Sequence, residues 1–175
     1  MRHWLPFLIA LGVGGSSACS SSAPPQPSST AKAAAFSVVP KTPMLTLAGE
    51  PTDLATVVRG RVALVSLWAT WCDACAKEMD GLNRLSASTH GRADAVVVGV
   101  AIGEPRATVL AFAQQRGLEY AQVVDEEFVF ADALGQRRLP ATLVVDRSGR
   151  VIFRGDALDA SSLAAFRRAL GDPAE

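Results

Sequence analysis

The sequence predicts an α/β protein with a central mixed sheet and helices on both faces. Two nearly continuous apolar runs, at 62–69 and 95–102, are typical of strands buried on both faces. A stretch with helical periodicity follows each run, and alternating strands and helices build a mainly parallel sheet. Two later short runs, 142–145 and 151–153, flank turn residues and predict an antiparallel hairpin at one edge.

Local signals predict the elements around the first buried strand. A short apolar segment at 45–47 predicts an edge strand, with a turn at 49–51 and a short helix over 53–58. Residues 73–88 predict one helix directly after the buried strand. The inward face of that helix carries Cys75, Met79, Leu82 and Ser86.

The second half contains clearer helix ends. Pro105 suits the first turn of a helix and Gly117 suits its end. Residues 122–124 predict a short strand and 126–134 a short helix. Asp159 can cap a last helix after the hairpin. The inward-facing residues of these two longer helices are Val109, Phe112, Ala113, Leu163, Phe166 and Leu170.

The N-terminal residues 1–18 predict a signal peptide. A short basic start precedes an apolar run of about ten residues, which is too short for the ~20 that a transmembrane helix needs. Small residues follow it, as in a cleavage region. A buried core helix is the alternative, but the basic residues before the apolar run and the small residues after it favour an export signal.

Cys19 follows Ser16-Ser17-Ala18, a stretch that resembles the lipobox of bacterial lipoproteins. The resemblance implies a lipid-anchored Cys19 at a membrane surface. Ser16 stands where the lipobox has a large aliphatic residue, and an ordinary signal-peptidase site would leave Cys19 unmodified. Residues 19–35, rich in Ser, Pro and Ala, predict a flexible tether, and residues 36–175 predict the folded domain.

Composition narrows the partners. Lys plus Arg number 17 and Asp plus Glu number 17, so the formal net charge is zero. The composition therefore gives no reason to expect nucleic-acid binding. Three cysteines are too few for a disulfide-stapled small domain. There is no second C-x-x-C, and the only histidines are His3 and His90, so we expect no metal and no cofactor.

Cys72 and Cys75 form a C-x-x-C pair between the buried strand and the predicted helix. The unpaired N–H groups and the dipole at a helix N-terminus stabilise a thiolate on the first cysteine. Three residues later the second cysteine lies close enough to bridge. We therefore expect Cys72 to be the exposed nucleophile and Cys75 to be the buried thiol that releases the mixed disulfide.

The segment Leu67-Trp68-Ala69-Thr70-Trp71-Cys72-Asp73-Ala74-Cys75 resembles the active-site stretch of thioredoxin-like proteins. More narrowly, it resembles the TlpA/ResA group of membrane-tethered bacterial thiol–disulfide oxidoreductases. The resemblance covers roughly 36–170 and implies the thioredoxin fold. The motif Leu139-Pro140-Ala141-Thr142 is similar to the family's cis-proline element, which faces the Cys pair. A substrate groove would then include the Leu139 backbone with Trp71, Asp73 and Ala74.

Two further positions bear on proton transfer. Ser66 stands where thioredoxins have a buried Asp behind the cysteines. The TlpA/ResA group has a glutamate one turn beyond the second cysteine, which is Glu78 here. The resemblance implies that this carboxylate exchanges protons with Cys75 or raises the thiol pKa values; a solvated helix glutamate is the alternative. Family members often have a proline that kinks this helix, and Asp80 stands in its place here. The sequence therefore does not decide whether the helix is kinked.

The resemblance implies an exported, monomeric oxidoreductase of the cell envelope or periplasm. Its partners would be client proteins with disulfides and a membrane thiol–disulfide electron donor, and cytochrome c maturation is one pathway that the family serves. Asp73 disfavours a neighbouring thiolate, so the pair should be a reductant. The alternatives are a peroxiredoxin-like thiol peroxidase, whose Thr and Pro before the cysteine are missing, and a metal-delivery module, whose wider Cys spacing is missing.

Overall fold

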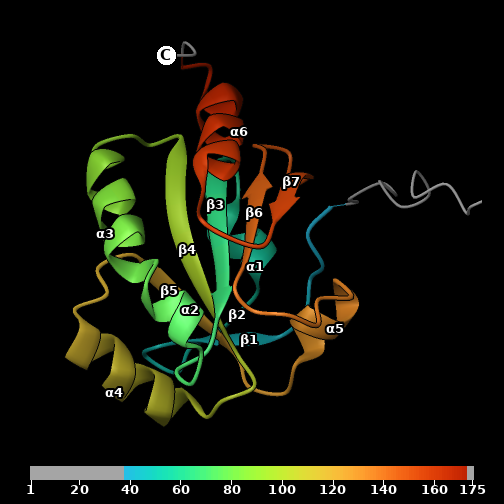
Figure 1. The fold of residues 1–175 in the computed structure, drawn as a ribbon. Helices are drawn as coiled ribbons and strands as arrows, with labels where there is room; N and C mark the ends of the chain where they lie inside the picture. The colour runs from blue at the N-terminus through green and yellow to red at the C-terminus, as the bar shows by residue number, and fades with distance from the viewer. Residues whose placement is uncertain (1–37, 173–175) are drawn as a thin grey trace, which may run out of the picture. The chain divides into compact units, whose positions relative to one another are not determined.

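The computed structural model describes residues 38–172. The predicted signal peptide, Cys19 and the tether lie outside them. The described chain forms a seven-stranded sheet of order β2-β1-β5-β4-β3-β6-β7, shown in Figure 1. Three central strands, β3 (Val62–Trp68), β4 (Ala95–Ile102) and β5 (Ala121–Asp125), are parallel, and the remaining pairs are antiparallel. The predicted mixed sheet is confirmed.

The central strand β3 explains the position of the Cys pair. All seven of its residues are buried, as the continuous apolar run predicts. It lies between β4 and the antiparallel strand β6 (Ala141–Val145), so both of its edges are paired. The chain leaves β3 beside the start of β6, and therefore the segment around Cys72 meets the segment around Pro140.

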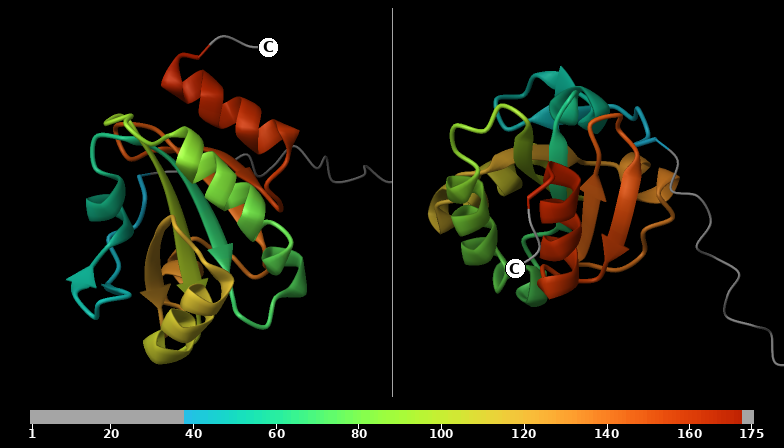
Figure 2. Two further views of the ribbon diagram at one scale, coloured as in Figure 1. Left: turned by 90° about the vertical axis from the view of Figure 1, so that its left-hand side faces the viewer. Right: turned by 90° about the horizontal axis from the view of Figure 1, so that it is seen from above.

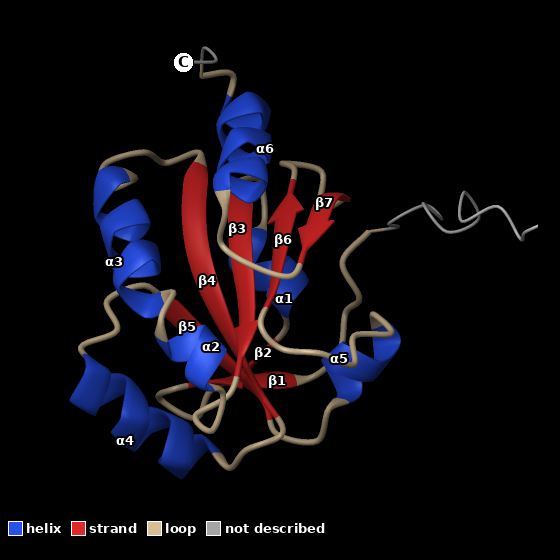
Figure 3. Ribbon diagram, viewed as in Figure 1, coloured by secondary structure: helices blue, strands red, loops and turns tan. Residues whose placement is uncertain are grey.

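Helices cover both faces of the sheet. On one face α1 (Leu54–Val58) and α5 (Val129–Ala133) bury apolar side chains against the strands. On the other face α3 (Met79–Ser88) and α6 (Ala160–Leu170) do the same. The left view of Figure 2 shows α3 and α6 on the side of the sheet away from α1, and Figure 3 shows α6 in front of β3. No helix of the described residues is long and apolar enough to cross a membrane.

The strand predicted at 45–47 is present one residue earlier, but the prediction that it lies at the edge of the sheet is wrong. β1 (Met44–Thr46) lies between β2 (Pro51–Thr52) and β5, antiparallel to both. The turn after β1 folds the chain back, and the Thr46 N–H donates to the Glu50 carbonyl at 2.9 Å. This pairing adds β2 as the true edge, which two residues without apolar alternation do not reveal.

The predicted single helix over 73–88 is two helices, α2 (Asp73–Ala76) and α3. The break falls at 77–78, where the Glu78 N–H donates to the Cys75 carbonyl at 3.0 Å, three residues back rather than four. No proline is present. The Glu78 carboxylate accepts a bond from the Leu158 N–H at 3.1 Å, before α6, so it is held outside its own helix.

The later elements follow the predictions closely. α4 (Arg106–Arg116) begins after Pro105 and ends at Gly117, which adopts φ 61°. The hairpin joins β6 to β7 (Val151–Gly155), and the Asp159 side chain caps α6. Helix α5 is shorter than the predicted 126–134, because Phe128 adopts a left-handed conformation and helical geometry starts only after it.

Candidate active site

Cys72 and Cys75 form a disulfide with their Cα atoms 5.2 Å apart. Cys72 precedes α2, and its Sγ accepts a hydrogen bond from the Cys75 N–H at 3.2 Å. Such a donor stabilises negative charge on the sulfur. Helix α2 has only four residues, so its dipole is small. The single hydrogen bond from the Cys75 N–H is therefore the main identifiable local contribution to stabilising negative charge on the Cys72 sulfur.

The exposure of the two cysteines differs from the prediction in one respect. Cys72 is 7 % exposed and Cys75 is 2 % exposed. Cys75 is thus the more buried thiol, as expected. The expectation of an exposed Cys72 is wrong for this oxidised state, because its sulfur is bonded to Cys75 and turned toward the helix.

The residues predicted for the substrate groove surround this pair. Trp71 is 67 % exposed, and Asp73 and Ala74 are also exposed. The Leu139–Pro140 peptide bond is cis, as expected, and Leu139 packs against the cluster that contains both cysteines. The Leu139 backbone makes no hydrogen bond within residues 38–172. Its N–H and carbonyl are therefore available to an added extended segment.

A carboxylate that the sequence reasoning missed fixes the loop before Cys72. Glu104, just beyond the end of β4, is 8 % exposed and accepts bonds from the Thr70 N–H at 2.7 Å and from the Thr70 hydroxyl. These bonds tie the loop to the neighbouring strand. The available signal is an acidic residue close to the carboxyl end of a buried parallel strand, a place where sites collect.

A buried polar row crosses the sheet on the face covered by α3. Ser66 is in register with Thr142 on one side and Gly99 on the other, and Gly99 is in register with Gln122. The Trp68 indole N–H donates to the Gln122 Oε1 at 3.1 Å. A Cβ on Gly99 would lie 2.2 Å from that Oε1, so the bond requires glycine at this position. Trp68 is therefore a core residue with a fixed polar partner.

Glu78 reaches the same buried region. Its Oε2 is buried without a hydrogen-bond partner in the described residues. Burial raises the pKa of Glu78, the Leu158 N–H opposes this shift, and the charge of Asp159 adds to it. Nearby Tyr120 is also buried, which raises its pKa to about 12, with a smaller contribution from the Glu78 charge. The half-buried Glu78 is therefore no ordinary solvated helix glutamate.

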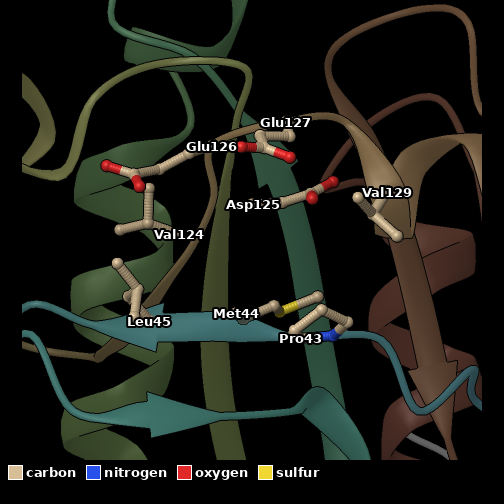
Figure 4. A pocket seen from close by; sticks show the side chains of 8 residues that line it. All are labelled: Pro43, Met44, Leu45, Val124, Asp125, Glu126, Glu127 and Val129. Atoms are coloured by element: carbon tan, nitrogen blue, oxygen red, sulfur yellow. The ribbon is translucent and has the colours of Figure 1, made fainter.

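A cavity away from the Cys pair is lined in part by acidic residues, and two of these hydrogen-bond to backbone N–H groups. It has a volume of about 280 Å³ and lies between β1 and the end of β5 (Figure 4). The Asp125 carboxylate points toward Val129 of α5 and accepts bonds from the Phe130 and Ala131 N–H groups at 3.1 and 3.0 Å. Glu126 accepts from the Arg106 N–H at 2.6 Å. Among residues 38–172, no three His, Cys, Asp or Glu side chains are grouped to hold a metal.

The strand order, the Cys-x-x-Cys pair after the central strand and the cis-proline beside it define a thioredoxin-fold protein with a redox-active type of cysteine pair. The Redoxin family model matches residues 26–169, and the chain belongs to the Redoxin family.

Two curated relatives and one solved structure illustrate the similarity. The thiol-disulfide oxidoreductase ResA of Geobacillus thermodenitrificans is 32% identical over 96 residues, which cover 55% of each chain. The thiol:disulfide interchange protein DsbE homolog of Paracoccus denitrificans is 33% identical over 94 residues, covering 53% of this chain and 49% of the relative. The chain thus matches about half of each relative's length.

The structure of a thiol-disulfide oxidoreductase from Bacteroides fragilis superposes with a TM-score of 0.66 at 20% identity. It covers 77% of this chain and 99% of the solved one. At this identity the likeness concerns the fold, and it confirms the predicted thioredoxin-like architecture.

Proposed function

We propose that the protein is a thiol–disulfide oxidoreductase that reduces disulfides in client proteins. The observation that carries this proposal is the Cys72–Cys75 disulfide beside a cis-proline segment whose Leu139 backbone is unpaired within residues 38–172. The names of the similar curated proteins support the same chemistry.

In the proposed cycle, the Cys72 thiolate attacks one sulfur of a client disulfide. The S–S bond of the client breaks, a Cys72–client mixed disulfide forms, and the other client sulfur leaves as a thiolate. Cys75 then attacks the Cys72 sulfur, which re-forms the Cys72–Cys75 disulfide and releases the second client thiolate. Two electrons pass to the client, and both client thiolates take up protons.

The surrounding residues would orient these steps. The Leu139 backbone would pair with an extended client segment, while Pro140 shapes the groove and Trp71, Asp73 and Ala74 form its other border. Glu78 would accept the proton of Cys75 as that thiol becomes a nucleophile. Burial that raises the pKa of Glu78 brings its proton affinity closer to that of a thiol, as proton exchange requires.

Asp73 supports the direction from protein to client. It is the first residue of α2, directly after Cys72, and its negative charge disfavours a Cys72 thiolate. The disulfide form is thereby favoured, which makes the dithiol a stronger reductant. A redox titration should give a midpoint below the ~ −180 mV of protein disulfide isomerase. A midpoint well above that value would contradict the reductase direction.

We further propose that the domain, residues 36–175, works in the cell envelope or periplasm as a monomer. Residues 1–18 would direct export, a lipid on Cys19 would anchor it, residues 19–35 would act as tether, and a membrane thiol–disulfide protein would supply electrons. Membrane fractionation tests the anchor: Cys19→Ala should move the protein to the soluble fraction, whereas a soluble wild type would refute it.

A further inference from the structure

A second hollow lies beside the Cys pair and is not explained by the fold. Its volume is about 220 Å³. Trp71, next to Cys72, forms one side, and Leu139, next to the cis-proline, forms another. We call it the client pocket, and its lining is Trp71, Ile102, Phe128, Ala131, Asp132, Gln136, Arg137, Arg138 and Leu139.

Phe128 is held in this pocket at the cost of an unfavourable backbone conformation. It is the only non-glycine among residues 38–172 with a positive φ, 61°, and its side chain is 47 % exposed. The ring packs on Gly103, where a Cβ would lie 2.0 Å from the Phe128 Cζ. The buried Asp125 carboxylate fixes the chain just beyond it. Such strain persists where the surrounding structure enforces it, and it is a common sign of a functional site.

The rim of the client pocket carries an unpaired positive charge. Arg137 makes an ion pair with Asp132 at 2.8 Å, so these two charges compensate each other. Arg138 is exposed, and its guanidinium makes no hydrogen bond or ion pair within the described part of the chain. The Arg138 carbonyl accepts a bond from the Gln136 side chain at 2.6 Å, which fixes its backbone beside Leu139.

We propose that the client pocket receives an apolar side chain from the client segment that pairs with Leu139, and that Arg138 binds a carboxylate of that segment. The inference rests on the proposed function. The volume is below the ~300–1,000 Å³ typical of small-molecule sites, so one side chain is a better fit than a whole cofactor. Apolar walls under a positive rim complement an apolar residue next to an acidic one.

Disulfide-bonded peptides that differ at two positions test this inference. One peptide carries Leu and Asp near its cysteine, a second carries Leu and Lys, and a third carries Ser and Asp. The reduced protein should react with the Leu–Asp peptide about three- to ten-fold faster than with either of the others, as exposed charge pairs and one apolar contact allow. Equal rates for all three peptides would overturn the proposal.

Variants separate the two contacts. Arg138→Glu should reverse the preference between the Asp and Lys peptides, whereas Arg59→Glu, matched in charge and lying just before β3 at the far end from Cys72, should keep the wild-type order. Phe128→Ala should reduce the Leu-over-Ser preference and leave the Asp-over-Lys preference. If Phe128→Ala does not fold, the Arg138 comparison still decides, because Arg138 is exposed.

A small neutral disulfide, bis(2-hydroxyethyl) disulfide, separates failure of the proposed reductase function from failure of the proposed client pocket. It should be reduced equally by the wild type and by the control variant Arg59→Glu, because it carries no charge and Arg59 lies far from Cys72, before the other end of β3. If the wild type fails to reduce it, the proposed function fails. If the small disulfide is reduced but Arg138→Glu leaves the peptide preferences unchanged, only the client pocket is refuted.

Discussion

Glu78 lies one helical turn beyond Cys75, and its two carboxylate oxygens have different surroundings. One oxygen accepts the Leu158 N–H, while the other is buried without a partner among the described residues. This arrangement fixes the side chain and raises its pKa through burial. The charged groups that act on it from neighbouring elements are Asp159 before α6 and, when ionised, Tyr120 before β5.

The pH dependence of stability tests the burial of Glu78. Its pKa is raised above the ordinary 4.5, so the folded protein keeps a proton that the unfolded chain has released. The stability associated with the protonated carboxyl is full below about pH 4.5 and is lost as pH rises through the folded pKa. Glu78→Gln keeps an oxygen for Leu158 but cannot ionise, so this fall should disappear.

Urea unfolding of the oxidised protein between about pH 4 and 8 measures the effect. Glu119→Gln is the matched control and should follow the wild type, because the Glu119 side chain is exposed and makes no hydrogen bond or ion pair within residues 38–172. Identical pH slopes for Glu78→Gln and wild type would contradict a buried, destabilised carboxylate.

Single residues differ in how far the sequence reveals them. Cys72, Cys75 and Pro140 stand in short motifs that carry their own geometry, so their placement could be predicted. Glu104 and Gln122 could not, because each matters through a partner far away in the chain: Thr70 for one and Trp68 for the other. The positive φ of Phe128 could not be predicted from the sequence, because its ring packs in the space that Gly103 leaves in another segment.

At the scale of elements, the loop between β3 and α2 is held by the segment that follows β4. The Glu104 carboxylate satisfies both the N–H and the hydroxyl of Thr70, two residues before Cys72. These bonds are part-buried and lie two residues before Cys72, so we expect them to help position the Cys pair. Glu104 acts through Thr70 and is therefore a positioning residue.

Glu104→Ala should lower the free energy of unfolding by about 1–3 kcal/mol, because it leaves a part-buried N–H and hydroxyl without an acceptor. The rate of client reduction should also fall, since the loop before Cys72 loses its anchor. Glu119→Ala is the control for a surface glutamate, and Glu104→Gln, which keeps one acceptor oxygen, should recover part of both losses. Unchanged urea unfolding in Glu104→Ala would refute this role.

Helices and strands that have their own periodicity and caps could be predicted from the sequence. Elements that depend on contacts with distant segments could not. The β4 strand and the ends of α4 follow from apolar runs, Pro105 and Gly117. The two-residue β2 exists because β1 is there to pair with it. The break between α2 and α3 falls at Glu78, whose carboxylate accepts the Leu158 N–H, and a helical pattern does not reveal such a distant contact.

At the scale of the whole domain, the sheet order brings the functional parts together. β3 is flanked by β4 and β6, so the segments after β3 and β4 and before β6 meet at one end of the sheet. The Cys pair, the Glu104 anchor and the cis-proline come from these three segments. The proposed client pocket takes its lining in part from α5 and the loop after it, so the proposal would place client recognition beside the disulfide.

The central claim is that disulfide reduction runs through Cys72, with Cys75 releasing the client. The most direct measurement is insulin disulfide reduction by the purified protein supplied with a dithiol. Wild type should turn over, and Cys72→Ser should fall to the uncatalysed rate. Cys75→Ser should accumulate a mixed disulfide between Cys72 and insulin. Unchanged turnover in Cys72→Ser, or a trapped complex that does not involve Cys72, would contradict the account.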